Sequence, residues 1–251
     1  MLKQIPQNYQ ASQSLLQGKT ILITGAGDGI GATAACTYAA HGATIILLGR
    51  TVQKLENIYD QIVKAGHPEP AIYPMDLEGA KDNDYYQLAD NIEKEFSSLD
   101  GLLHNAARLD SLMPLEQYDL KIWARLMQVN LTAPFLLTHA CLPLLKKSAD
   151  ASVIFTSSGV AHHGRAYWGA YGVTKAGCDN LMQILADEVE NHTNIRSNSI
   201  DPGAVRTRMR RLAYPAEDAS LLPLPEDIML AYLYLMGADS KEFTGDIFSV
   251  K

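Results

Sequence analysis

Short apolar runs rich in β-branched residues alternate along the chain with longer segments whose apolar residues recur at helical spacing. Such runs, apolar throughout, are typical of strands buried on both faces of a parallel sheet. Seven strands are predicted, at Thr20–Thr24, Thr44–Leu48, Ala71–Tyr73, Gly101–His104, Ser152–Thr156, Ile195–Ile200 and Asp246–Val250. Helices are predicted near 30–41, 51–65, 82–97, 116–146, 167–191 and 226–236. The alternation predicts an α/β fold, a doubly wound parallel sheet with helices on both faces.

Prolines mark two irregular places in this pattern. Pro134 lies inside the predicted helix 116–146 and removes a backbone hydrogen bond, so we expect a kink near Asn130–Ala133. The stretch 201–225 contains four prolines and no clear period, which predicts a functional lid at about 204–225. Nothing else interrupts residues 19–251, so we expect one domain there, preceded by a polar extension at 1–18.

Composition narrows the class of protein. The 251 residues are 47% hydrophobic and 20% charged, as in a globular domain, and the net charge of −7 argues against broad nucleic-acid binding. The start of the chain lacks the features of a signal peptide, and no apolar run reaches the length of a membrane span. The three cysteines match neither a zinc site nor a disulfide framework. We therefore expect a cytoplasmic protein with no metal site.

The first predicted strand leads directly into a glycine-rich turn, and a helix of small residues follows. A bound phosphate needs backbone N–H donors at a helix N-terminus and no Cβ atoms in the way. A turn of this kind in the first βα unit predicts dinucleotide binding, as in a Rossmann fold. A plain tight turn is the alternative. The residues assigned to the cofactor here are Gly25, Gly27, Asp28, Gly29, Ile30 and Gly31.

Arg50 follows the second strand, where the adenosine ribose of a bound dinucleotide should lie. An acidic residue there would bind a 2′-hydroxyl, whereas a guanidinium matches a 2′-phosphate, so Arg50 favours NADP, with NAD as the alternative. A solvent-exposed arginine that opens a helix would look the same in sequence. Asp28 argues the other way, because a carboxylate in the turn repels phosphate.

Tyr171 and Lys175 are four residues apart in the predicted helix 167–191, so the ammonium can stand beside the phenol. An isolated phenol is too weak an acid for efficient proton transfer near neutral pH, and a neighbouring cation favours its ionised form. Ser158, at the end of a strand, can donate a hydrogen bond to the same substrate oxygen. Each residue alone is compatible with an ordinary structural role, but together they predict a proton-transfer site.

Six motifs in this order resemble the short-chain dehydrogenase/reductase family over nearly the whole chain. They are Thr24-Gly25-x-x-x-Gly29-x-Gly31, Asn105-Ala106, Val129-Asn130-Leu131, Ser158, Tyr171-x-x-x-Lys175 and Pro202-Gly203. The resemblance implies catalysis by Asn130, Ser158, Tyr171 and Lys175, in which Asn130 holds a water that relays protons from Lys175. It further implies cofactor contacts from Asp76, Leu77, Asn105, Ala106, Tyr171, Lys175, Pro202 and Gly203. For Asp76, a simple helix cap is the alternative.

Within that family the chain departs from the usual pattern at His104 and Ala107, which stand where asparagine and glycine are common. Several of its segments resemble one bacterial branch, the YciK-type oxidoreductases. The resemblance implies hydride transfer between a nicotinamide cofactor, preferably NADP, and a small carbonyl or alcohol substrate. It also implies a homodimer or homotetramer formed through the helices at 116–146 and 167–191.

Substrate is expected under the lid. The candidate walls are Leu109, Met113, Tyr167, Trp168 and Tyr214. Four arginines, Arg206, Arg208, Arg210 and Arg211, gather in the lid, where they can meet an anionic substrate, close on a cofactor phosphate, or pair with carboxylates on an exposed surface. A nucleotide-binding sensor without catalysis is the alternative function, although it would not need Ser158, Tyr171 and Lys175 together.

Overall fold

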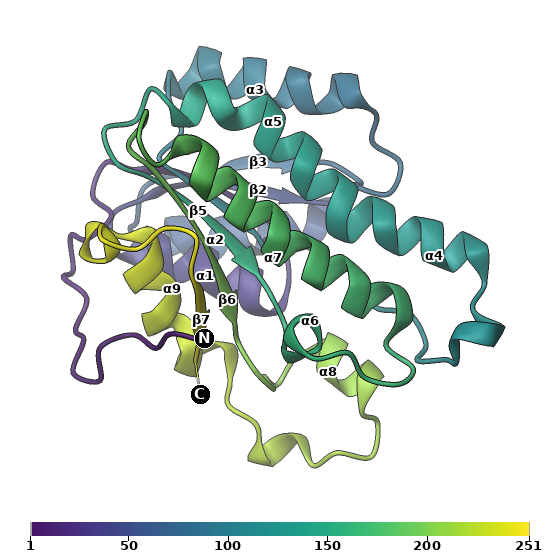
Figure 1. Ribbon diagram of the computed structural model, residues 1–251. Coiled ribbons are helices and arrows are strands. Elements are labelled where there is room, and N and C mark those ends of the chain that lie inside the picture. Colours follow the sequence, from purple (N-terminus) through teal and green to yellow (C-terminus); the bar gives the residue numbers. More distant parts are fainter. Residues whose placement is uncertain (1, 251) are drawn as a thin grey trace.

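A computed structural model describes residues 2–250, in which seven parallel strands form one sheet in the order β3-β2-β1-β4-β5-β6-β7 (Figure 1). The strand bounds are β1 Thr20–Thr24, β2 Thr44–Gly49, β3 Ala71–Pro74, β4 Gly101–His104, β5 Ala151–Thr156, β6 Ile195–Asp201 and β7 Ile247–Ser249. The first three strands extend the sheet in one direction, and the chain then crosses to the other side of β1. In such sheets ligands bind at this switch point, beyond the carboxyl ends of the strands.

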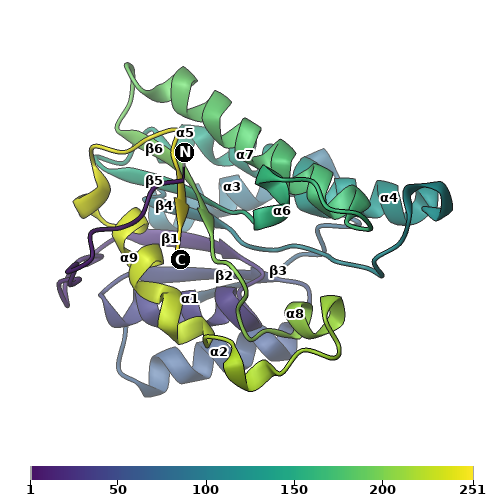
Figure 2. The same cartoon turned by 60° about the horizontal axis from the view of Figure 1, so that its bottom comes forward.

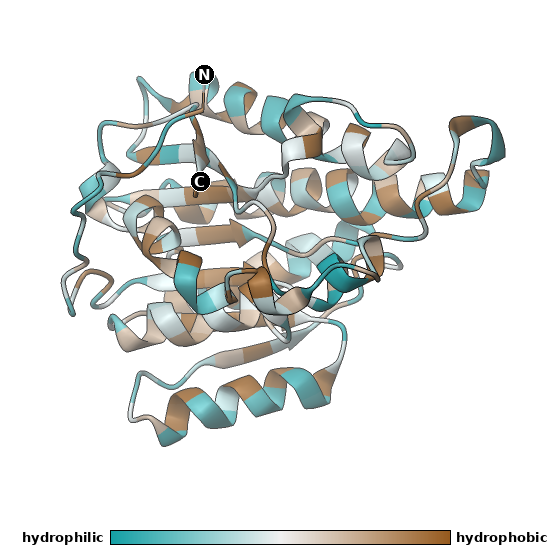
Figure 3. Ribbon diagram, turned by 90° about the horizontal axis from the view of Figure 1, so that it is seen from below, coloured by the Kyte–Doolittle hydropathy of each residue, from teal (hydrophilic) through white to brown (hydrophobic). Residues whose placement is uncertain are grey.

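Helices cover both faces of the sheet, and this confirms the predicted fold class. On one face lie α1 Gly29–Ala40, α2 Val52–Lys64 and α9 Met229–Met236; on the other lie α3 Asp82–Phe96, α5 Ala133–Leu145 and α7 Gly169–Val189 (Figure 2). Ile21 and Ile23 of β1 face the first layer, while Leu22 between them packs into the second. Apolar residues accordingly run along the strands between the helix layers (Figure 3).

The predicted helix 116–146 is divided at its proline. A short 3₁₀ turn at Leu115–Gln117 precedes α4 Leu120–Met127, and a π-helical turn, Gln128–Thr132, joins α4 to α5. Pro134 is among the first residues of α5, so its missing N–H and its ring are accommodated by the wider turn before it. The irregularity expected near Asn130–Ala133 takes the form of this π-helical turn, and Asn130 lies at its centre.

The segment predicted as a lid, residues 204–225 (the lid segment), has more regular structure than its prolines suggest. It contains α8 Arg208–Ala213 and a 3₁₀ turn, Ala219–Leu221, and it runs into a second 3₁₀ turn at Pro225–Ile228. Thr207 caps α8 by accepting a hydrogen bond from the Arg210 N–H, and the Arg206 guanidinium donates to the carbonyl of Ser220. The segment is held by polar side-chain bonds and its sequence has no hydrophobic period. The pattern of apolar residues therefore does not predict its helix. Elsewhere the ends of the predicted helices and strands differ from the observed ones by up to three residues. The short helix α6 Gly159–His162 was not predicted.

Residues 2–18 lie along α9 and β7 (Figure 2). Leu16 is completely buried, and the ring of Tyr9 packs edge-on against Tyr234 with 4.9 Å between centroids. Lys3 forms an isolated parallel bridge with Phe248, and its ammonium pairs with Asp246 at 2.6 Å. The extension is thus attached to the domain along the edge of the sheet.

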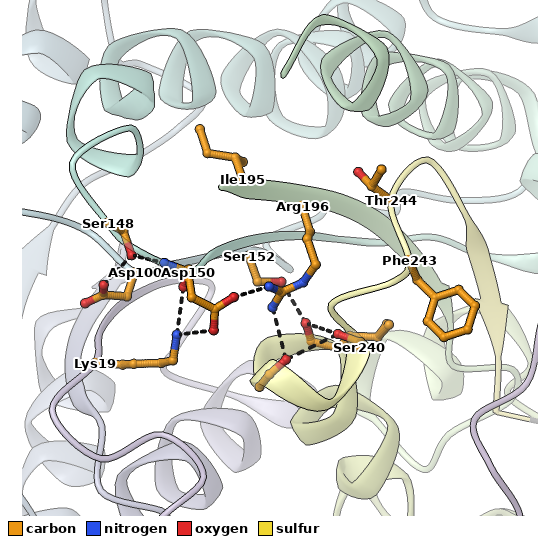
Figure 4. A network of polar contacts seen from close by, with 12 residues as sticks. Lys19, Asp100, Ser148, Asp150, Ser152, Ile195, Arg196, Ser240, Phe243 and Thr244 are labelled. Carbon is orange, nitrogen blue, oxygen red and sulfur yellow. Dashed lines mark hydrogen bonds and ion pairs between the residues drawn. The ribbon is translucent and has the colours of Figure 1, made fainter. Parts of the chain in front are cut away.

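A polar network ties the starting ends of three strands together, away from the carboxyl ends (Figure 4). Asp150, just before β5, accepts a hydrogen bond of 2.9 Å from the Lys19 ammonium and pairs with Arg196 of β6. The Arg196 guanidinium also donates to the carbonyl of Gly237 at 3.0 Å. Burial alone would raise the pKa of Asp150, but the two cations lower it on balance. The network therefore holds an ionised carboxylate between two fixed cations.

Candidate active site

A cleft of about 580 Å³ opens at the carboxyl ends of the strands, between the sheet and the lid segment. Nearly all predicted site residues line it, although they come from segments far apart in the sequence. The predicted residues in its wall are Gly25, Gly27, Asp28, Gly29, Ile30, Arg50, Asp76, Leu77, Asn105, Ala106, Ser158, Tyr171, Lys175, Pro202 and Gly203. Two others, Gly31 and Asn130, lie behind the wall.

The glycine-rich turn is built for close approach of backbones. Gly25 has φ of 69°, and a Cβ there would lie 3.0 Å from the Cα of Ala106. A Cβ at Gly31 would collide with the carbonyl oxygen of Gly25, which is why Gly31 supports the turn from behind. The α1 helix begins at Gly29, and the side chain of its N-cap residue, Asp28, makes no capping hydrogen bond. The first turn of α1 is thus left without a side-chain cap at the edge of the cleft.

Asp28 has a cationic partner that the sequence did not reveal. Its carboxylate pairs with the ammonium of Lys54, in the first turn of α2, and this hydrogen bond lowers the pKa of Asp28. Arg208 of the lid segment contributes a further cationic influence on the same group. The negative charge that argued against phosphate binding is therefore compensated from two sides. The only hint of this partner in the sequence is that Lys54 lies four residues after Arg50, which is itself predicted to lie at the cofactor.

Arg50 and Arg208 are the cations at this end of the cleft that are left for a ligand. Both are exposed, both line the cleft, and neither forms an ion pair with other groups of residues 2–250. Arg208 follows Thr207, whose methyl group would lie 3.5 Å from a Cβ at Gly29. The start of α8 is therefore positioned directly over the start of α1. Thr207 and Arg208 were not predicted as cofactor residues.

The predicted proton-transfer residues Ser158, Tyr171 and Lys175 all line the cleft. Lys175 is 4% exposed, donates a hydrogen bond of 2.6 Å to the carbonyl of Thr156, and lies 5.8 Å from the centre of the Tyr171 ring. Ser158 stands two residues beyond Thr156, in extended backbone at the start of α6. The hydroxyl of Ser157 instead donates to buried Asp179 at 2.7 Å. Ser158, and not Ser157, is thus the serine available to a ligand.

Asn130 reaches the site through the backbone of a neighbouring loop. Its side-chain oxygen accepts a hydrogen bond of 2.7 Å from the Arg108 N–H, and its amide nitrogen donates to the Arg108 carbonyl at 2.9 Å. The backbone carbonyl of Asn130 accepts from the Cys178 thiol. Asn130, expected to hold a relay water, therefore has its side chain bonded to the loop that follows β4 and its backbone carbonyl bonded to Cys178.

The departure at His104 has a structural role. The ring is buried against Phe155, with 4.5 Å between centroids, and its Nε2 is hydrogen bonded to the hydroxyl of Thr138 at 2.8 Å. Burial, with a smaller contribution from Lys175, lowers the pKa of His104 to about 3. The imidazole is consequently neutral at ordinary pH and serves as a packed core residue beneath the cleft.

The predicted substrate walls are only partly in place. Leu109 and Trp168 line the cleft, whereas Tyr214 packs behind Trp168 with 6.1 Å between centroids. Tyr167 and Met113 lie outside the cleft wall and are joined by a backbone hydrogen bond of 3.2 Å. Among residues 2–250 there is no group of three side chains suited to hold a metal ion, and no helix is long and apolar enough to cross a membrane.

Comparison with known proteins agrees with the geometry. The sequence model of the short chain dehydrogenase family matches residues 19–218. The chain belongs to the short-chain dehydrogenase family. It is 45% identical to the Escherichia coli K12 oxidoreductase YciK over 244 residues, which cover 97% of this chain and 96% of YciK. The resemblance to this family and to its YciK-type branch is thereby confirmed, and the chain is a nicotinamide-dependent oxidoreductase of that family.

Solved structures of short-chain dehydrogenases superpose closely on this one. One from Pseudomonas syringae has a TM-score of 0.95 with 52% identity and covers 97% of this chain and 99% of its own. One from Shigella flexneri 2a, complexed with NADP, has a TM-score of 0.93 with 45% identity and covers 95% of this chain and 99% of its own. One from Escherichia coli CFT073, complexed with NADPH, also reaches 0.93, with 46% identity, and covers 96% of this chain and 99% of its own.

Proposed function

We propose that this short-chain dehydrogenase binds NADP(H) in preference to NAD(H) and transfers hydride between it and a small carbonyl or alcohol compound. The observation that carries the proposal is the distribution of cationic side chains along the cleft. Arg50 and Arg208 are unpaired at the end next to the glycine-rich turn, while Lys175, beside Tyr171, also lines the cleft. The NADP and NADPH complexes of the relatives support the same cofactor.

The residues present fit a dinucleotide. The uncapped first turn of α1 offers backbone N–H groups to a diphosphate, with Gly25, Gly27 and Gly29 leaving space for it and Gly31 supporting the turn. Arg50 would hold the 2′-phosphate, and Asp76 and Leu77 would border the adenine. Arg208 would bind the diphosphate from the lid segment. Asn105, Ala106, Pro202 and Gly203 would complete the nicotinamide side, together with the hydroxyl of Tyr171 and the ammonium of Lys175.

The chemistry assigned to the chain follows from these positions. When bound, the nicotinamide supplies or accepts hydride. Tyr171 donates a proton to the carbonyl oxygen during reduction, and Ser158 donates a hydrogen bond to the same oxygen as negative charge develops. Lys175, fixed by the Thr156 carbonyl, places its positive charge beside the phenol. Asn130 acts indirectly, because its side chain fixes the loop that carries Arg108.

The cofactor preference is tested by fluorescence titration with NADPH and NADH. In an Arg50→Asp variant we expect the affinity for NADPH to fall about 10- to 100-fold, the effect of losing one charge-assisted contact, while NADH binding changes little. A variant that still prefers NADPH would refute the role of Arg50. Exposed Arg211, outside the cleft wall, provides the matched control as Arg211→Gln.

Catalysis, as opposed to cofactor sensing, is tested at Tyr171. With any carbonyl compound that the wild-type protein reduces, we expect Tyr171→Phe to lower turnover at least about 100-fold, the contribution of general-acid catalysis. NADPH binding should largely persist, because only the hydroxyl contact is lost while the contacts proposed for the diphosphate, the 2′-phosphate and Lys175 remain. If turnover were unaffected, the assignment of Tyr171 as proton donor would be wrong. If no carbonyl compound were reduced at all while NADPH still bound, the sensor function would be favoured.

A homodimer or homotetramer through α5 and α7 is part of the proposal. Both helices cover one face of the sheet and leave apolar side chains exposed, with Phe135 47%, Val173 49% and Ile184 48% accessible. Exposed apolar side chains on two helices of one face are suited to a partner copy. We expect Phe135→Glu combined with Ile184→Glu to shift the mass found by light scattering toward a monomer. An unchanged mass would place the interface elsewhere.

A further inference from the structure

Trp168 is held at the substrate end of the cleft by an unusual turn. Its two neighbours both have positive φ, 76° at Tyr167 and 26° at Gly169. A bulky non-glycine residue in that region is rare and strained, and such strain persists only where surrounding contacts enforce it. Here the Tyr167 carbonyl accepts a hydrogen bond from the Met113 N–H, and the ring of Tyr118 lies where a Cβ of Gly169 would be. The turn is thus locked from two sides.

The locked turn places the indole next to the proton donor. The Trp168 ring lies 5.5 Å from the ring of Tyr171 and 6.1 Å from that of Tyr214. Leu109 and Met209 pack in the same small apolar cluster. A carbonyl compound whose oxygen meets Tyr171 therefore presents its substituents to an aromatic and aliphatic wall.

Three of the four arginines around this wall are already engaged by carboxylates or carbonyls. The Arg108 guanidinium bonds Glu78 at 2.7 Å and Asp110 at 3.2 Å, and Glu78 also pairs with Arg125. Arg210 pairs with Glu217 at 2.6 Å and lies 3.9 Å over the ring of Tyr214. Arg206 is bonded to carbonyls within the lid segment. The unpaired Arg208 lies beside Asp28 and Gly29, at the cofactor end.

We propose that the substrate is an uncharged carbonyl compound, or its alcohol, that carries an aromatic ring, and that Trp168 stacks on this ring. The inference rests on the proposed function, because it concerns the same cleft and the same proton donor. It also decides among the roles open to the arginines of the lid segment: they do not select an anionic substrate.

Three related probes separate ring from charge. Ethyl phenylglyoxylate is neutral and aromatic, phenylglyoxylate has the same ring with a carboxylate, and ethyl pyruvate has the same ester without the ring. With NADPH, we expect kcat/KM to be highest for the aromatic ester and about tenfold or more lower for the acid, since placing its carboxylate against the apolar wall carries a desolvation cost. Equal or better reduction of the acid, or of the aliphatic ester, would overturn the proposal.

Trp168 variants test its role separately. We expect Trp168→Ala to raise KM for the aromatic ester about three- to tenfold, the effect of one stacking contact, with little change for ethyl pyruvate. Trp168→Phe should restore most of the loss, and the Kd of NADPH should be unchanged in both variants. A loss of equal size for both esters would indicate a structural role and refute the stacking assignment.

A binding measurement completes the test. The sequence has two tryptophans, so Trp123→Phe leaves Trp168 as the only indole. In that background, with NADP bound, the aromatic ester should quench the tryptophan fluorescence and the acid should not. If NADPH binds but no probe is bound or reduced, the substrate class is wrong and the cofactor assignment stands. If NADPH itself does not bind, the proposed function falls.

Discussion

His104 is a titratable side chain whose charge the folded protein cannot accept. Its pKa is lowered to about 3 by burial, whereas an unfolded histidine titrates near pH 6.5. Between these values the unfolded chain binds one more proton than the folded chain, so the stability associated with His104 is present above about pH 6.5 and is lost as the pH falls.

The resulting prediction concerns stability in mild acid. Between pH 7 and pH 5, His104 alone should cost about 2 kcal/mol of the free energy of unfolding. We therefore expect His104→Asn to show a smaller fall in Tm over this range than the wild-type protein. The exposed His192, changed to Asn, serves as the control, and an unaltered pH dependence in His104→Asn would contradict the assignment.

Arg208 leads to a second prediction at this scale. Because a diphosphate is common to NADPH and NADH, Arg208→Gln should weaken both by a similar factor, about tenfold, when measured by titration. Arg50 should affect NADPH alone, and Arg211→Gln should affect neither. A loss confined to NADPH in Arg208→Gln would mean that this arginine recognises the 2′-phosphate instead.

Individual side chains also show where sequence reasoning reaches its limit. The motif spacing was sufficient to place Tyr171, Lys175 and Ser158 in one cleft, because i and i+4 in a helix and the end of a strand are local geometries. The meaning of Asp28 was not accessible, since its partner Lys54 is 26 residues away and meets it only in the folded chain. Asn130 likewise could be found by motif, whereas its bonds to Arg108 depend on tertiary structure.

Among the elements, the π-helical turn before Pro134 does more than accommodate a ring. It directs the Asn130 amide sideways onto both backbone polar groups of Arg108, so one side chain fixes the loop between β4 and α4. Asn130→Ala would leave a partly buried N–H and C=O without partners, which costs about 1–3 kcal/mol. We expect a Tm lower by several degrees. Asn57→Ala, at an exposed amide on α2, should change the stability by no more than about 0.5 kcal/mol.

The accuracy of the predicted elements follows their physical origin. Strands β1 and β2 were predictable because burial on both faces makes them almost continuously apolar, whereas β6 is buried although most of its residues are polar. Helix α8 of the lid segment was missed, since it is held by the Thr207 cap and by polar contacts that leave no hydrophobic period. An irregularity before Pro134 was predictable from one residue, but its form as a π-helical turn was not.

At the scale of the whole molecule, a stabilising polar network and the binding cleft lie at opposite ends of the strands. The network of Lys19, Asp150 and Arg196 joins the starting ends of β1, β5 and β6, and the cleft lies beyond the other ends (Figure 4). Asp150→Ala would leave two cations without their counter-ion. We expect a loss of about 2 kcal/mol or more in the free energy of unfolding, measured with denaturant, with an unchanged Kd for NADPH. A changed Kd would show that the polar network and the cleft are coupled.

The strand order has a consequence for synthesis of the chain. After β1, each strand pairs with an edge already made: β2 beside β1, β3 beside β2, then β4, β5, β6 and β7 successively outward on the other side. No strand has to be inserted between two others, so the sheet can grow as the ribosome extends the chain. The contacts of residues 2–18 must wait, because Tyr9 packs on Tyr234 of α9 and Lys3 bridges to Phe248 of β7. Residues 2–18 are made before the sheet they pack against and can take their final place only after α9 and β7 have been made.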